Sequence, residues 1–172
     1  MDLTPRSIFA AHPDGYTLRL AGAEDAEAYY QNNFNPLDPE VACLTGSKTT
    51  FSREEVVEHF RRCTVAPDRY DFLIHAPDGR IIGESVLNEI DWGTKSANYR
   101  IAIFHREHRN RGIGSWALEK TLELGFSALE LRRVTLTVFP CNHRARHIYE
   151  KAGFRPIQML TGPDEIEMEL TR

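Results

Sequence analysis

The sequence predicts an α/β (α+β) fold in which a mixed, mainly antiparallel central sheet is flanked by helices. Two observations predict it. Short segments of alternating apolar residues, typical of strands, are interspersed with segments whose apolar residues repeat at helical spacing. Three of the strand segments follow one another with only turns between them, which indicates an antiparallel meander. At 172 residues, the chain is expected to form a single domain over residues 1–172.

The expected element order is β-α-α-β-β-β-α-β-α-β. The strands are expected at residues 16–20, 70–76, 80–90, 98–104, 133–139 and 165–170. The helices are expected at residues 24–33, 52–64, 114–130 and 142–152.

Local signals support the elements of the N-terminal third. Residues 16–20 alternate, and the helix that follows opens with acidic residues. Residues 34–51 contain two prolines, a glycine and other turn formers, and predict a loop with room for one helical turn. Ser52 and Glu55 then form a capping box, in which each side chain satisfies a free backbone N–H at the start of a helix.

The remaining elements are supported by turn and helix-end signals. Pro77-Asp78-Gly79 favours a tight turn between two strands, because proline fixes one dihedral angle and glycine permits a positive φ. Residues 91–96 form the next turn. The long helix has a buried stripe that includes Leu118 and Leu122, and Gly153 is placed to end the last helix in the left-handed conformation.

Composition and charge exclude several classes of function. The 21 Lys and Arg against 25 Asp and Glu give a net charge of −4, which argues against nucleic acid as a partner. No apolar run approaches the ~20 residues of a membrane span, and no signal peptide is recognisable. Cys43, Cys63 and Cys141 show no disulfide or metal spacing, and the histidines form no metal motif, so no metal and a cytoplasmic location are expected.

The segment Arg109-Asn110-Arg111-Gly112-Ile113-Gly114 joins a predicted strand to the long helix. Its glycines let the backbone turn and approach a ligand, and the first amides of the helix then point at it with the helix dipole behind them. Two arginines add positive charge. The segment therefore predicts a pocket for a diphosphate, although a solvated loop before a helix would show the same residues.

Two other phosphate motifs fit this segment less well. Its glycines formally match the dinucleotide fingerprint GxGxxA, but seven residues separate Phe104 from Gly112 and no acidic residue ends the next strand. A Walker loop is excluded because no Gly-Lys-Ser/Thr follows.

A second segment, Asn142 to Phe154, follows the next predicted strand. Each of its residues has a structural explanation: Asn142 can cap the helix, Tyr149 can belong to the core, and Gly153 can end the helix. Cys141, beside Asn142, has no partner base and is expected to be a small buried residue.

Together, a strand, Arg-x-x-Gly-x-Gly, a helix, a strand and Asn-x-x-Ala-x-x-x-Tyr-x-x-x-Gly-Phe resemble the GNAT superfamily of N-acetyltransferases. The resemblance covers residues 80–154, while the N-terminal third agrees in element order. It implies the GNAT fold, with a splayed gap between the strands at 98–104 and 133–139. The chain is most similar to the branch that acetylates ribosomal-protein N-termini, polyamines or other small amines.

The resemblance implies acetyl-CoA as co-substrate. The amides of residues 111–115 and the Arg109 side chain would hold the diphosphate, the strand edge at residues 103–105 would pair with the pantetheine arm, and Asn142 would reach that arm. The cofactor-binding residues implied in this way are Ile103, Phe104, His105, Arg109, Asn110, Arg111, Gly112, Ile113, Gly114, Ser115, Asn142 and Tyr149.

The implied reaction is direct attack of an amine on the thioester. A backbone N–H near Phe104 would stabilise the oxyanion, and Tyr149, a phenol with an ordinary pKa near 10, would protonate the departing thiolate. Glu84 is the candidate base, with Glu89 or a chain of water molecules as alternatives. The loop at residues 32–51 and the turn that carries Trp92 are expected to shape the amine pocket.

The sequence leaves the acceptor open among a protein N-terminus, a polyamine and another small amine. A catalytically degenerate acyl-CoA-binding sensor is the alternative function, and a protein-interaction domain is a further one. A homodimer is compatible with the sequence.

Overall fold

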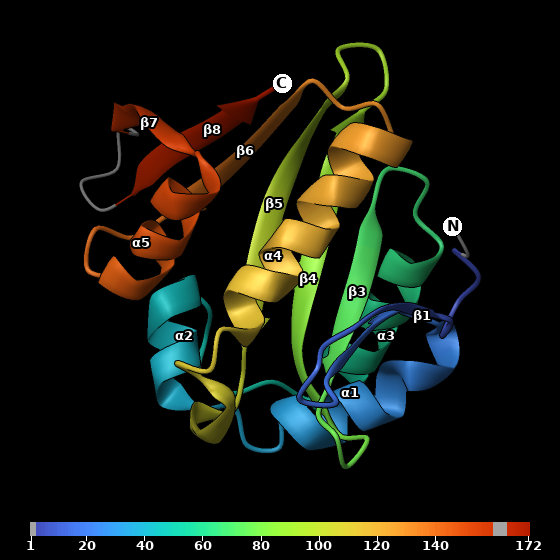
Figure 1. Ribbon diagram of the computed structural model, residues 1–172. Coiled ribbons are helices and arrows are strands. Elements are labelled where there is room, and N and C mark those ends of the chain that lie inside the picture. Colours follow the sequence, from blue (N-terminus) through green and yellow to red (C-terminus); the bar gives the residue numbers. More distant parts are fainter. Residues whose placement is uncertain (1–2, 160–164) are drawn as a thin grey trace.

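The computed structural model describes residues 3–159 and 165–172, in which eight strands form one sheet of order β1-β2-β3-β4-β5-β6-β8-β7 (Figure 1). The strands are β1 (Ile8–Ala11), β2 (Thr17–Leu20), β3 (Tyr70–His75), β4 (Ile81–Asp91), β5 (Ser96–Ile103), β6 (Arg133–Val138), β7 (Arg155–Met159) and β8 (Ile166–Thr171). The helices are η1 (Ala23–Asp25), α1 (Ala26–Asn33), α2 (Pro39–Thr45), α3 (Arg53–Thr64), η2 (Arg106–His108), α4 (Ile113–Glu123), η3 (Leu124–Ala128) and α5 (His143–Ala152).

Helices cover both faces of this sheet (Figure 1). On one face, Leu73 of β3 and Phe104 pack into a buried cluster with residues of α1, α2 and α3. On the other face, Phe72 and Ile74 of β3 pack against Ala117 of α4. This alternation of buried residues along a strand confirms the predicted fold class. No helix among the described residues is long and apolar enough to cross a membrane.

The sheet is antiparallel except between β5 and β6, which pair in parallel over only three residue pairs. Ser96, Ala97 and Asn98 face Arg133, Val134 and Thr135, and the ladder ends there. Beyond Asn98 the two strands diverge, and Figure 1 shows them meeting at one end of the sheet only. The splayed gap implied by the resemblance is therefore present.

Strands β1 and β7 and the short helix η2 were not predicted from the sequence, and helix α2 is longer than the one helical turn expected in the loop at residues 34–51. Helix α2 lies within the expected loop: Asp38 accepts a hydrogen bond from the Glu40 N–H (2.8 Å), Pro39 is in the first turn, and Gly46 ends the helix at φ +66°. The proline and the glycine that indicated a loop are thus the start and stop signals of a short helix.

The two unpredicted strands, β1 and β7, are the edge strands of the sheet. β1 has four residues, Ile-Phe-Ala-Ala, which are all apolar and show no alternation. β7 contains Pro156, which argues against a central strand but is tolerated at an edge, where its missing N–H breaks no ladder. The helix predicted at residues 114–130 is present as α4, which ends at Glu123 and continues as one π-helical turn to Ala128.

Candidate functional site

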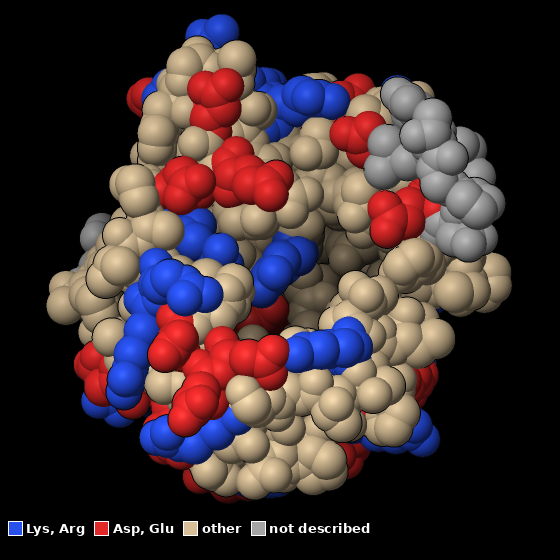
Figure 2. Space-filling model, turned by 180° about the vertical axis from the view of Figure 1, so that it is seen from behind, with Lys and Arg blue, Asp and Glu red and all other residues tan. Residues whose placement is uncertain are grey.

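A cleft of about 1180 Å³ passes through the sheet at the gap between β5 and β6. Its lining comes from both faces, with Tyr29 and His59 from α1 and α3, and Gly114 and Ile148 from α4 and α5. Figure 2, seen from behind Figure 1, shows a hollow in this face of the molecule with side chains of both charges around it. A ligand in the cleft can therefore contact elements on either side of the sheet.

A row of backbone amides stands at one end of the cleft, where the chain enters α4. Asn110 and Gly112 both have positive φ, +59° and +78°, which turns the chain sharply before the helix. The Trp116 N–H, bonded to the Gly112 carbonyl at 3.0 Å, is the first with an intrahelical partner. Among the described residues, the amides of 111–115 have no backbone acceptor. Free amides at a helix N-terminus have the geometry that favours an anion, as expected for this segment.

The two glycines of this amide loop have different roles. A Cβ at Gly112 would meet nothing within 4 Å, so only its positive φ favours glycine there. A Cβ at Gly114 would lie 3.9 Å from both Ile101 of β5 and Ile148 of α5. Gly114 therefore lies between the two walls of the cleft, where a bulkier residue would narrow it.

The edge of β5 that faces the gap is made by other residues than expected. The Phe104 N–H donates to the Ile82 carbonyl of β4 at 2.9 Å, so it is not available to an oxyanion. Backbone groups of successive residues alternate between the two edges of an antiparallel strand. The N–H groups of Ile101 and Ile103 therefore point toward β6, where the ladder is absent. The edge that faces the gap is therefore formed by Ile101 and Ile103, two residues before the expected stretch of 103–105. The expected role of the Phe104 N–H at this edge is corrected.

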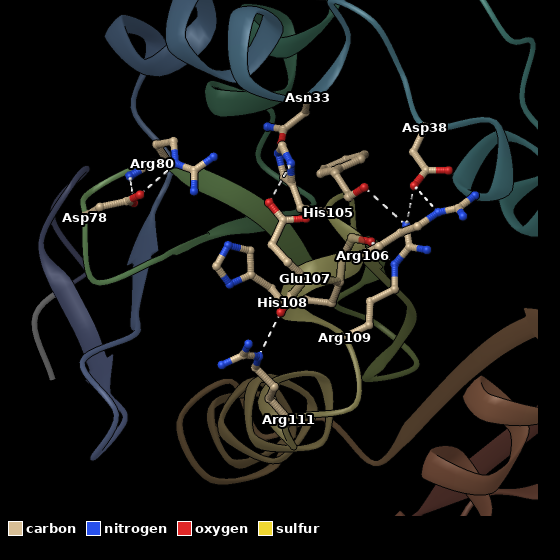
Figure 3. A network of polar contacts seen from close by, with 12 residues as sticks. Asn33, Asp38, Asp78, Arg80, His105, Arg106, Glu107, His108, Arg109 and Arg111 are labelled. Carbon is tan, nitrogen blue, oxygen red and sulfur yellow. Dashed lines mark hydrogen bonds and ion pairs between the residues drawn. The ribbon is translucent and has the colours of Figure 1, made fainter.

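The Arg109 side chain does not extend into the loop as a phosphate ligand. Its guanidinium donates to the carbonyls of Ile103 (3.1 Å) and Phe104 (3.1 Å) and to the carboxylates of Glu40 (2.7 Å) and Asp38 (3.3 Å). Only 8% of the side chain is exposed. Figure 3 shows Arg106 and Arg109 together at Asp38. Arg109 thus fastens the end of β5 to α2, and the expected side-chain contact with a diphosphate is corrected.

The neighbours of Arg109 have local partners as well. His105 Nε2 lies 3.2 Å from the Asn33 side-chain oxygen, which ties η2 to α1. Arg111 is exposed, donates to the Glu107 carbonyl at 2.7 Å, and lies at the N-terminus of α4 in Figure 3. Asn110 lines the cleft. The positive charge at the amide loop therefore comes from Arg111 and the helix dipole rather than from Arg109.

Tyr149 and Asn142 bring α5 to the cleft. Asn142 caps the helix through its side-chain oxygen, which accepts from the Ala145 N–H at 3.2 Å. Tyr149 is 5% exposed and packs edge-on against Tyr99, with ring centroids 6.4 Å apart. Its hydroxyl has no hydrogen-bond partner among the described residues. Burial raises the pKa of Tyr149, so the phenol is protonated at neutral pH.

Glu84 lies on the opposite face of the sheet from Tyr149 and also lines the cleft. Its carboxylate accepts from the Tyr29 hydroxyl at 2.6 Å and from Arg100 at 2.9 Å. The charge of Glu84 raises the pKa of Arg100, and burial, together with Glu84, raises the pKa of Tyr29. The carboxylate is therefore an ion-paired group whose two oxygens both accept hydrogen bonds.

Sequence reasoning missed a group of charged residues around Glu84. Arg100 forms an ion pair with Glu84. Arg69 donates two hydrogen bonds of 2.7 Å to the Asp71 carboxylate, and the His59 ring lies 3.4 Å from the Cys63 sulfur. One signal was present for Arg100: it interrupts a strand of otherwise apolar or uncharged residues. Of these pairs, only Glu84 with Arg100 joins two separate elements, β4 and β5, and this pairing is not visible in the sequence.

Two residues expected near the acceptor, Glu89 and Trp92, lie outside the cleft, and Cys141 differs from its expected burial. Glu89 is exposed on a bulge of β4 at φ +53°, and Trp92 is 42% exposed in a turn that does not line the cleft. Cys141 is exposed rather than buried, which corrects that expectation. Within residues 3–159 and 165–172, no group of three or more His, Cys, Asp or Glu side chains is placed to hold a metal ion.

A family model for the acetyltransferase (GNAT) domain matches residues 16–155, so the chain belongs to this family. It is similar to the spermidine N(1)-acetyltransferase of Vibrio cholerae, with 31% identity over 83 residues, 48% of this chain and 47% of that protein. It is also similar to the spermidine N(1)-acetyltransferase of Escherichia coli, with 34% identity over 96 residues, 51% of each chain. The chain spans about half the length of the curated relatives it matches.

Among solved structures, the fold resembles that of the Vibrio cholerae spermidine N-acetyltransferase in complex with CoA and spermine. The TM-score is 0.79, the identity is 23%, and the match covers 91% of this chain and 95% of that one. At this identity the likeness concerns the fold. These relatives belong to the polyamine side of the branch that the sequence suggested.

Proposed function

We propose that the protein is an N-acetyltransferase that moves an acetyl group from acetyl-CoA to a primary amine by direct attack on the thioester. One observation carries the proposal: an anion-binding amide loop, an unpaired strand edge and a buried phenol meet in a single cleft through the sheet. Family membership supports it, and so does the CoA in the structure of the Vibrio cholerae relative.

The chain offers acetyl-CoA a fitting set of contacts. The amides of residues 111–115 would hold the diphosphate, and the edge at Ile101 and Ile103 would pair with the amides of the pantetheine arm as a further strand would. Asn142 keeps its side-chain nitrogen for that arm, because its oxygen caps α5. This arrangement leads the thioester from the loop along β5 toward the middle of the cleft.

Two groups would then serve the reaction itself. A β5 amide that faces the gap, at Ile101 or Ile103, would stabilise the developing oxyanion in place of the Phe104 N–H. Tyr149 would give its proton to the departing thiolate. Glu84 stays our proposal for the base, acting through a water molecule because both its oxygens already accept hydrogen bonds.

The remaining expectations complete the proposal. The whole chain would act as one domain, and the acceptor would be a primary amine. The curated relatives are named for spermidine, which puts polyamines among the candidates. A homo-oligomer is part of the proposal, since a structure of the Vibrio cholerae relative is dodecameric. The cytoplasmic location stays a prediction.

Two measurements test the proposal. Titration calorimetry with acetyl-CoA should show binding, and initial-rate release of free CoA should be detected with at least one member of a panel of primary amines. Binding without turnover on any amine would instead identify an acyl-CoA sensor. Absence of binding, with no rise in melting temperature, would refute the assignment, because a ligand of the native state must stabilise it.

A further inference from the structure

The chemistry of the acceptor can be narrowed from the charges on the far side of the cleft. Resting on the proposed function, we propose that the acceptor is a small primary amine that also carries a carboxylate, and that Arg100 binds this carboxylate. The relatives reported above are named for spermidine, which has no carboxylate.

The acceptor side of the cleft is identified by the alternation of side chains on β5. The Tyr99 hydroxyl lies 2.9 Å from Ser85, which in turn contacts Thr121 of α4, so Tyr99 points to the α4 face. Arg100, the next residue, points to the opposite face, where it meets Glu84. The amide loop and Tyr149 lie on the α4 side, so the acceptor would enter from the side of Arg100.

The buried carboxylates on this side are already neutralised. The Asp71 carboxylate, with 10% of the side chain exposed, accepts hydrogen bonds from two guanidinium nitrogens of Arg69. Glu84, with 11% exposed, accepts from Tyr29 and Arg100. A polycation needs carboxylates with unused charge, and a second cation at Glu84 would have to compete with a guanidinium at 2.9 Å.

The described acidic residues on the rim of this side have basic neighbours. Glu55 pairs with Lys48, and the exposed Glu58 of α3 is followed by Arg62 one turn later on the same helix. Burial, with the nearby Arg100 charge, lowers the pKa of His59, which is neutral at pH 7. Acidic and basic side chains are therefore balanced among these described residues, and Glu165, just before β8, is one further acidic residue that lines the cleft.

Arg100 is the charged group of the cleft floor that retains unused capacity. It is 46% exposed and lines the cleft, and among the described residues it makes one hydrogen bond, through one terminal nitrogen. A guanidinium has five N–H donors, arranged to fit a carboxylate with two parallel bonds. An ammonium group would be repelled by the Arg100 guanidinium, whereas a carboxylate would accept hydrogen bonds from its unused N–H groups.

The position of Arg100 also limits the size of the acceptor. It directly precedes Ile101, whose N–H faces the gap, and successive residues of a strand rise by only about 3.3 Å. The guanidinium itself stands at the end of the Arg100 side chain beside Glu84, so the acceptor must span from there to the gap at Ile101. Short amino acids of different chain length test this spacing.

Matched acceptors test the proposal without any mutation. Initial rates of CoA release are compared for β-alanine and 4-aminobutyrate, for the amide of each, for 2-aminoethyl phosphate and for spermidine. We expect kcat/KM for the carboxylates to exceed that for the amides by about 10- to 100-fold, the size of a charged hydrogen-bond pair, and to exceed that for spermidine. Equal use of acid and amide, or a preference for the phosphate or for spermidine, would overturn the proposal.

Variants then separate binding of the acceptor from positioning of Glu84. Arg100→Gln should lower kcat/KM much more for the carboxylates than for their amides, and Arg100→Lys should retain part of the preference. An equal loss for acid and amide would mean that Arg100 acts only through Glu84. Arg80→Gln is the matched control: Arg80 is 49% exposed, pairs with Asp78 alone and lies outside the cleft, so the preference should not change.

Failure of the proposed function gives a different result. If acetyl-CoA binds but no amine is acetylated, calorimetry of β-alanine on the CoA-bound protein still reports the site. If β-alanine binds to the wild type but not to Arg100→Gln, the proposed carboxylate site is supported and the proposed transferase activity is refuted. If β-alanine binds neither to the wild type nor to Arg100→Lys, each verified as folded by its melting curve, both proposals are refuted.

Discussion

The two ends of the cleft are built from different parts of the polypeptide. At the amide loop and along β5, the ligand-facing groups are backbone N–H groups, exposed by Gly112 and by the end of the β5–β6 ladder. At the acceptor end, they are side chains of α1, β4, β5 and the start of β3 that hold one another by ion pairs and hydrogen bonds. Every residue type except proline has a backbone N–H, whereas an ion pair exists only with its two particular side chains.

The difference indicates where specificity can vary. Substitutions around the amide loop change its function only when they alter the backbone path, so this end suits a ligand common to many proteins. One substitution at Arg100 or Glu84 would change the charge offered to an acceptor. Variants at the two ends, and at Tyr149 between them, test this contrast.

Tyr149→Phe should lower kcat by about 100-fold or more, since a positioned acid contributes ~10²–10⁴-fold. Acetyl-CoA affinity should stay within a few-fold, because the ring and its packing remain. Tyr99→Phe is the control, whose hydroxyl contacts Ser85 in the core rather than the ligand. Steady-state kinetics and calorimetry measure both, and an unchanged kcat in Tyr149→Phe would remove the phenol from the reaction.

Arg109→Ala should lower the free energy of unfolding by about 2–4 kcal/mol, because it strips partners from two carbonyls and two carboxylates in a largely buried site. Arg106 shares Asp38 but is 68% exposed, so Arg106→Ala should cost no more than about 0.5 kcal/mol. Urea denaturation compares the two. Equal losses would mean that Arg109 does not fasten β5 to α2.

Gly112→Asp should weaken acetyl-CoA binding by about tenfold or more, since it brings a negative charge to the amides meant for the diphosphate. Gly79→Asp is a close control, with φ +87° against +78° and an equally empty space around its Cβ, in a turn away from the cleft. Both variants should lose similar stability. Calorimetry that finds equal affinity in both would place the diphosphate elsewhere.

The pH dependence of kcat should show no descending limb below about pH 10. The acid must be protonated to act, and burial raises the pKa of Tyr149 above the ordinary phenol value near 10. The active form is therefore lost only at higher pH. A fall in kcat between pH 8 and 9, with the acetyl-CoA concentration saturating, would assign the proton to another group.

The same contrast explains how far the sequence could predict the molecule. Gly112, Gly153 and the capping box at Ser52 act locally, and the elements that depend on them were placed to within a few residues. Helix α2 was expected only as one turn within a loop, because Pro39 and Gly46 are typical both of loops and of helix ends. Local signals therefore predicted the helix ends and the turn into α4.

The remaining site features depend on contacts between distant segments. Whether Ile103 or Phe104 faces the gap is set by the pairing of β5 with β4, where Ile103 is opposite Gly83 and the Phe104 N–H bonds Ile82. The partners of Arg109 lie about 70 residues earlier, at Asp38 and Glu40. Neither relation leaves a pattern in the sequence, so both expectations required correction.

The short ladder between β5 and β6 has a consequence for solubility. An unpaired strand edge recruits strands from other molecules and promotes aggregation, and proteins normally shield such edges at the border of a sheet. Here the open stretch at Ile101 and Ile103 lies in the interior of the strand order, recessed between two halves of the sheet. An extended ligand can enter this gap, whereas the edge strand of a neighbouring folded protein cannot. The open edge can therefore bind a ligand without promoting aggregation.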